Sequence, residues 1–216
     1  MRMTSGLLAA GMLALAANGM ARDEVRAAGV DTDQVTVWNR FADRLVTLHE
    51  KQIQGRKIRE TEEFGGYARM PRFYREVSYY DVDSGRLMSR IQLETEHPDR
   101  MHSIEVYVYD SSGRLLRDYM AWYLPKYRNA PRATTINLYH YGHGVRGWRQ
   151  FDASGNRLYE RCNAWAGDQA GEILVELDED ELAEALSEKN SIMTGELYLR
   201  CFGDIRASAG PYLNPH

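Results

Sequence analysis

Hydrophobic residues in the first quarter of the chain recur at every third or fourth position. Within residues 33–54 this stripe comprises Trp38, Phe41, Leu45 and Leu48. Such spacing is typical of an amphipathic helix that buries one face. Asp33 suits the positive end of that helix and Gly55 is a suitable stop. We therefore predict a helix over 33–54 whose apolar stripe packs on a sheet.

From Arg56 to Trp165 the period changes from helical spacing to a period of two. Alternation of this kind is typical of antiparallel strands with one face on the core. The predicted strands span 57–64, 73–80, 86–94, 104–109, 116–124, 134–141, 145–151 and 157–164. In the segment 116–124 the apolar residues Leu116, Met120, Trp122 and Leu124 share one parity, interrupted by Asp118. We assign this parity to the core side.

Three similar turns separate these strands. Asp83-Ser84-Gly85 has the same form as the longer turns that begin at Asp110 and Asp152 and reach Gly113 and Gly155. Asp and Ser can bond to the backbone of a tight turn, and Gly supplies a positive φ. Turns of this kind join neighbouring antiparallel strands, so they predict a meander.

The last fifty residues add three shorter elements. We predict a strand over 172–177, a helix over 178–189 and a last strand over 194–202, followed by a poorly ordered tail over 211–216. The predicted fold class is therefore α+β. An antiparallel β-meander forms a curved sheet or partial barrel. The long N-terminal helix and the short C-terminal helix pack on it.

The two cysteines, Cys162 and Cys201, are predicted to form a disulfide. Cys201 shares parity with Leu197 and Leu199 on the predicted last strand, which would place it toward the core. A bridge would then tie that strand to the end of the meander. Closing a loop of about 40 residues stabilises a fold by about 4 kcal/mol in the chain-entropy model.

Residues 1–21 have the pattern of a secretory signal peptide. Arg2 precedes an uncharged apolar run over 7–17, and small residues precede a suitable cleavage point after Ala21. The run is shorter than the roughly 20 apolar residues that a membrane span needs. We therefore predict a periplasmic or secreted protein, with residues 22–216 forming one strand-rich domain without a membrane span.

Composition and missing motifs narrow the function classes. The formal net charge of −4 argues against a nucleic-acid binder, which is usually basic. The sequence contains neither a P-loop nor a G-x-G-x-x-G pattern, so no cofactor is predicted. It also lacks a G-x-S-x-G nucleophile elbow.

The segment 139–144 (YHYGHG) is the strongest candidate for catalytic chemistry. His140 and His143 could bind a metal ion, with His102 or a carboxylate as a further ligand. Residues three apart on a strand point to opposite faces, so this pairing needs a bend at Gly142. An exported hydrolase or metal-dependent enzyme centred on His140 and His143 is therefore one alternative function.

The sequence contains 14 tyrosines, and many alternate with the predicted core positions. Tyrosine and arginine are enriched at the centres of recognition surfaces. The predicted binding surface comprises Tyr107, Tyr109, Tyr119, Tyr139, Arg90 and Arg117. The leading expectation is a non-catalytic envelope protein that uses this face to bind a protein or glycan partner. A lipid or small-ligand carrier, using the hollow of a curved sheet, is a further alternative.

Overall fold

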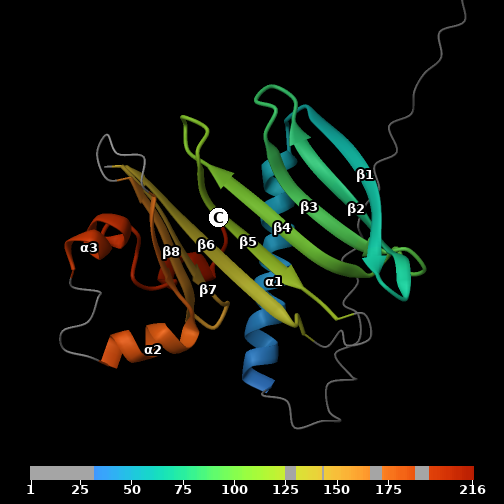
Figure 1. Ribbon diagram of the computed structural model, residues 1–216. Coiled ribbons are helices and arrows are strands. Elements are labelled where there is room, and N and C mark those ends of the chain that lie inside the picture. Colours follow the sequence, from blue (N-terminus) through green and yellow to red (C-terminus); the bar gives the residue numbers. More distant parts are fainter. Residues whose placement is uncertain (1–31, 125–129, 143, 166–171, 188–194) are drawn as a thin grey trace, which may run out of the picture.

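The computed structural model describes residues 32–124, 130–142, 144–165, 172–187 and 195–216 (Figure 1). The first of its elements is the helix α1 (Thr32–Ile53). Its buried stripe contains Phe41, Leu45 and Leu48, which confirms the predicted helix to within one residue at each end. Trp38 lies at the edge of the stripe, and its indole donates a hydrogen bond of 2.8 Å to Ser154 Oγ.

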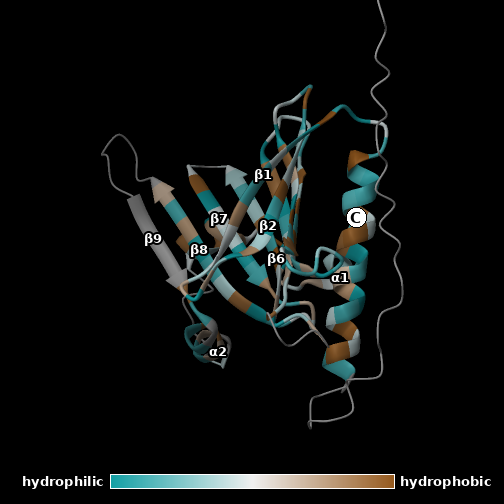
Figure 2. Cartoon of the chain, turned by 90° about the vertical axis from the view of Figure 1, so that its right-hand side faces the viewer, coloured by the Kyte–Doolittle hydropathy of each residue, from teal (hydrophilic) through white to brown (hydrophobic). Residues whose placement is uncertain are grey.

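Nine antiparallel strands follow α1, and each pairs with its neighbours in sequence. They are β1 (Ile58–Tyr67), β2 (Met70–Asp81), β3 (Leu87–Glu94), β4 (Met101–Tyr109), β5 (Leu115–Trp122), β6 (Ala133–Gly142), β7 (Val145–Phe151), β8 (Arg157–Trp165) and β9 (Glu172–Leu177). The sheet is a curved meander that does not close into a barrel, with β1 and β9 at its edges (Figures 1 and 2). The predicted fold class is thereby confirmed.

The turn chemistry is as predicted. Asp110 Oδ1 accepts a hydrogen bond of 2.9 Å from the backbone N–H of Arg114, and Asp152 Oδ1 accepts one of the same length from Asn156. The glycine of each turn has a positive φ, 91° at Gly113 and 92° at Gly155. A side chain with a Cβ rarely adopts this conformation, so these glycines let the next strand begin.

The α-helices in the described part of the chain contribute to one core, on one side of the sheet. Phe41 of α1 packs edge-on against Tyr119 of β5, with ring centroids 6.2 Å apart. The helices α2 (Glu179–Ser187) and α3 (Glu196–Phe202) join the same cluster through Leu182 and Phe202. Figure 2 shows α1 standing along one side of the sheet. The other side is called the open face below.

The C-terminal tail differs from the prediction that it is poorly ordered. A short 3₁₀ helix, η3 (Gly210–Leu213), lies near the end of the chain. Arg44 of α1 donates a hydrogen bond of 3.3 Å to the carbonyl oxygen of Leu213, and Arg117 of β5 donates one of 2.5 Å to that of His216. These contacts fix the tail between α1 and the sheet.

The predicted disulfide is confirmed, but one of its partners lies on a different element. Cys162 and Cys201 are bonded, with their Cα atoms 5.9 Å apart. The predicted strand over 194–202 is wrong, because Cys201 lies in α3. Its buried neighbours Tyr198 and Phe202 stand at helical spacing, while Leu199, which we assigned to the core, is 55 % exposed. The bridge therefore ties a helix to β8.

Candidate binding face

The open face is crossed by a continuous row of polar and aromatic side chains. Strand register places Tyr107 opposite Asp118, Asp118 opposite Asn137, Asn137 opposite Gln150, and Gln150 opposite Tyr159. Paired residues of an antiparallel sheet point to the same side. The row therefore joins five adjacent strands, β4 to β8, on the side that points away from α1.

Asp118 is the centre of a hydrogen-bond network within this row. Its Oδ1 accepts from the Asn137 amide at 2.6 Å and its Oδ2 accepts from the Tyr139 hydroxyl at 2.7 Å. The Asn137 amide oxygen in turn accepts from Trp148 Nε1 and Gln150 Nε2, both at 2.9 Å. Burial raises the pKa of Asp118, and the hydrogen bonds partly offset this effect. The network holds two large rings, Tyr139 and Trp148, in fixed orientations.

A second network lies across β2, β3 and β4. The Arg90 guanidinium lies between two carboxylates, with Nε 3.0 Å from Glu76 Oε1 and Nη1 3.7 Å from Glu105 Oε2. Gln92 Nε2 donates to Glu76 Oε2 at 2.7 Å, and the Tyr107 hydroxyl donates to Glu105 Oε2. Burial, together with the adjacent Glu105 carboxylate, raises the pKa of the Tyr107 hydroxyl. Tyr107 therefore stays a neutral donor.

Aromatic side chains surround a hollow of about 350 Å³ at one end of the open face. Its walls come from the β1–β2 hairpin and from β3, β4 and β5, and include Tyr67, Tyr74, Gln92, Glu105 and Trp122. We call it the aromatic hollow. The register of β4 shifts next to Ser103, between the pairs Gln92–Ser103 and Leu93–Met101. A bulge of this kind redirects a side chain, and here the extra residue is His102.

Four of the six residues of the predicted binding surface lie on the open face: Tyr107, Tyr109, Tyr139 and Arg90. Arg90 and Tyr107 belong to the second network, and Tyr139 belongs to the first. Tyr109 donates a hydrogen bond of 2.9 Å to the carbonyl oxygen of Leu87, and Arg86 lies over its ring. These four side chains are half-buried and already oriented.

The other two residues, Tyr119 and Arg117, lie on the helix side, which corrects their prediction. Tyr119 is fully buried against Phe41. Arg117 donates to the Tyr119 hydroxyl at 2.9 Å. The parity of β5 is the reverse of our assignment, since Ala121 packs in the core with Tyr119, while Leu116 is 38 % exposed. Large apolar residues lie on both sides of this strand. The hydropathy pattern alone therefore predicted the wrong set of residues to face the core.

The proposed histidine pair is not assembled by the described residues. His140 lies on β6 with its Nε2 3.7 Å from Asp204 Oδ2, and His143 lies outside the described residues. His102, the suggested further ligand, instead has its Nε2 within hydrogen-bond distance of Tyr67 and Trp122. In the described part of the chain, no three His, Cys, Asp or Glu side chains gather closely enough to hold a metal ion.

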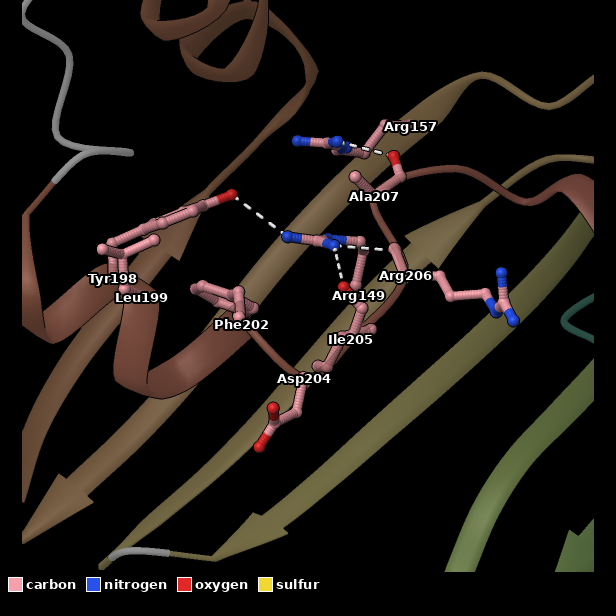
Figure 3. A pocket seen from close by; sticks show the side chains of 10 residues that line it. Arg149, Arg157, Tyr198, Leu199, Phe202, Asp204, Ile205, Arg206 and Ala207 are labelled. Atoms are coloured by element: carbon pink, nitrogen blue, oxygen red, sulfur yellow. Dashed lines mark hydrogen bonds between the residues drawn. The ribbon is translucent and has the colours of Figure 1, made fainter.

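A larger hollow of about 460 Å³ lies on the helix side, between β7, β8 and α3 (Figure 3). Arg149 lies at its base and is 3 % exposed. Its guanidinium donates to the carbonyl oxygens of Ile205 and Arg206, both at 2.7 Å, to the Tyr198 hydroxyl at 3.2 Å, and to the Glu160 carboxylate. Four of its five N–H groups are thereby used within the fold. Arg149 therefore clamps the C-terminal segment to the sheet.

Tyr198 and Glu160 complete this clamp. The Tyr198 hydroxyl donates to Glu160 Oε2 at 2.6 Å. Burial and the adjacent Glu160 carboxylate raise the pKa of Tyr198 to about 12. Glu160 is fully buried, and its charge is compensated by Arg149 and by Arg157, whose Nη1 lies 3.4 Å from Glu160 Oε1. These polar groups are hydrogen-bonded and ion-paired to one another within the fold. We therefore assign this hollow a structural role.

Sequence reasoning missed the aromatic hollow. Tyr74 and Trp122 occupy ordinary strand positions, His102 is the extra residue of the bulge, and no local motif marks them. Only the pairing of β2, β4 and β5 brings them together with Tyr67. A local signal is His102, a polar residue near the start of β4 that the fold buries.

No protein-family model, no curated protein and no solved structure matches the chain. Of the helices in the described part of the chain, none combines the length and the apolar character needed to cross a membrane. Function is therefore inferred from the chemistry of the open face.

Proposed function

We propose that the chain is an exported, non-catalytic envelope protein that binds its partner on the open face. The observation that carries this proposal is the arrangement of that face. Its tyrosines, tryptophans and charged groups are held in place by their own hydrogen bonds, yet α1, α2 and α3 all pack on the other side. Side chains that are already fixed lose little conformational entropy on binding.

Two independent features support export. Residues 1–21 have the signal-peptide pattern, and the Cys162–Cys201 bridge suits an oxidising compartment. We expect the mature protein to begin at Arg22 and to be recovered from the periplasm or the medium with both cysteines oxidised. Intact-mass spectrometry of the fractionated protein measures both properties.

The lining of the open face favours a polar partner over a lipid tail. Asp118 and Glu105 are charged groups on it, and Asn137 and Gln92 add amides. A lipid carrier needs an apolar cavity, because burying unpaired polar groups against hydrocarbon is costly. The carrier alternative is therefore less well supported than the recognition of a polar envelope component.

Site-specific photo-crosslinking in living cells tests the proposal. A benzophenone amino acid at Arg146 or Arg161 probes the open face, because both positions are exposed and are paired in register with open-face residues. The same group at Arg40 or Glu50, on the exposed side of α1, is the matched control. We expect a defined crosslinked product from the open-face positions alone. Equal products from both sides, or none from the open face, would contradict the proposal.

A further inference from the structure

The aromatic hollow is organised around one buried histidine. His102 is 1 % exposed, and its Nε2 lies 2.7 Å from the Tyr67 hydroxyl and 3.0 Å from Trp122 Nε1. Indole Nε1 can only donate, so His102 Nε2 must accept, which fixes the neutral tautomer with its proton on Nδ1. Its ring also stacks on Tyr74, with centroids 5.6 Å apart and planes 19° apart.

These contacts make rigid aromatic walls from distant parts of the sheet. Tyr67 and Tyr74 come from the β1–β2 hairpin, and Trp122 comes from β5. His102 holds Tyr67 and Trp122 at their polar atoms and Tyr74 at its ring face. These rings therefore offer a large contact area with little further loss of conformational freedom. The hollow is therefore prepared to stack against a flat ligand with an apolar face.

The remaining walls are polar and oriented. Tyr107 and Arg90 hold Glu105 through its Oε2, and Glu76 holds the Gln92 amide through its Nε2. A carboxylate has a second oxygen and an amide has a carbonyl oxygen. Both groups can therefore accept hydrogen bonds from ligand hydroxyls.

The charges near the hollow disfavour strongly charged ligands. An anion would meet the Glu105 carboxylate, which lines the hollow, and a cation would gain little there because Arg90 and the Tyr107 hydroxyl already contact that carboxylate. A neutral ligand with one apolar ring face and several hydroxyls can stack on the aromatic side chains and hydrogen-bond to the polar side chains of the hollow. A sugar ring has this combination, because its C–H groups stack on aromatic rings while its hydroxyls bond to carboxylates and amides.

We infer that the aromatic hollow binds one ring of a neutral glycan, stacked on Trp122 and hydrogen-bonded to Glu105 and Gln92. This inference rests on the proposed function, because the hollow belongs to the open face. It assigns the chemical class of the partner, a polysaccharide chain of the envelope. A partner protein becomes an outcome that the experiment can reveal.

Titration of the purified mature protein with maltotetraose, cellotetraose and chitotetraose tests the inference. Binding is followed by tryptophan fluorescence and by calorimetry. We expect saturable binding of at least one sugar, with a fluorescence change that Trp122→Phe removes. Glu105→Gln and Gln92→Ala should each weaken binding at least tenfold. Arg40→Ala, on the exposed side of α1, should leave the affinity unchanged.

The outcomes separate this inference from the proposed function. If none of the three sugars binds while the open face still crosslinks to a protein, the glycan assignment is wrong and the open face remains a binding face. If a sugar binds but Glu105→Gln and Gln92→Ala do not weaken its binding and Trp122→Phe keeps the fluorescence change, the sugar binds elsewhere on the protein and the assigned site is wrong. If the open-face crosslinks are also absent, the proposed function fails as well. Near-ultraviolet circular dichroism of each variant, compared with wild type, separates loss of binding from loss of fold.

Discussion

At the scale of single residues, His49 shows how burial converts a titratable group into a fixed part of the core. Its Nδ1 lies 2.7 Å from Ser89 Oγ, and its ring packs edge-on against Tyr79 with centroids 4.6 Å apart. Burial lowers the pKa of His49 from 6.5 to about 4. The folded chain therefore keeps a neutral imidazole over a pH range in which the unfolded chain binds a proton.

This difference makes stability depend on pH. The contribution of His49 is fully present above pH 6.5 and is lost as the pH falls toward about 4. The total loss is about 3 kcal/mol at about 1.4 kcal/mol per pKa unit. We expect His49→Gln, which can still bond to Ser89, to lose less stability than wild type between pH 7 and pH 5. Urea unfolding at both values measures this, with His97→Gln as an exposed control. Equal losses of unfolding free energy between pH 7 and pH 5 in wild type and His49→Gln would contradict this prediction.

At the scale of elements, the packing of α3 on β7 depends on a glycine. A Cβ added at Gly147 would lie 2.3 Å from the carbonyl oxygen of Cys201. The backbone of α3 therefore rests directly on the strand, which brings Cys201 within bonding distance of Cys162. Because the contact is with backbone and the disulfide holds the helix, little relaxation is available.

Gly147→Ala should therefore destabilise the fold. Overpacking of a tight contact costs about 1–3 kcal/mol. Gly142→Ala is the matched control on the neighbouring strand, because its Cβ would lie at an ordinary 3.5 Å from the His140 ring. Chemical denaturation should show a loss of stability for Gly147→Ala that Gly142→Ala does not share. Equal effects at the two glycines would show that α3 can move away from β7.

The elements also show where a hydropathy pattern is enough to predict the type, bounds and orientation of a helix or strand. The stripe of α1 has one dominant period, and the bounds of α1, β7 and β9 were predicted to within one residue. β5 was predicted as a strand but faced the wrong way, because Met120 and Trp122 on the open face are as large as Tyr119 in the core. α3 was mistaken for a strand, since its seven residues are too few to distinguish a period of two from one of 3.6.

At the scale of the whole molecule, the two sides of the sheet differ in the kind of side chain that they present. The helix side contains the core, and the open face contains oriented polar and aromatic groups. The tyrosines of the open face could be predicted from alternation along single strands. The aromatic hollow could not, because Tyr67, His102 and Trp122 come together only through strand pairing and a bulge.

This division predicts that stability and binding can be changed separately. Tyr119→Ala removes a fully buried ring and should cost about 3–5 kcal/mol. Tyr141→Ala removes a half-buried ring on the open face, where Arg114 and Arg146 lie over it, and should cost less than about 1 kcal/mol. It should nevertheless reduce the crosslinking yield from Arg161, since it alters the surface that the partner contacts. A Tyr141→Ala protein that unfolds as readily as Tyr119→Ala would instead make the open face a second core, covered by some other part of the molecule.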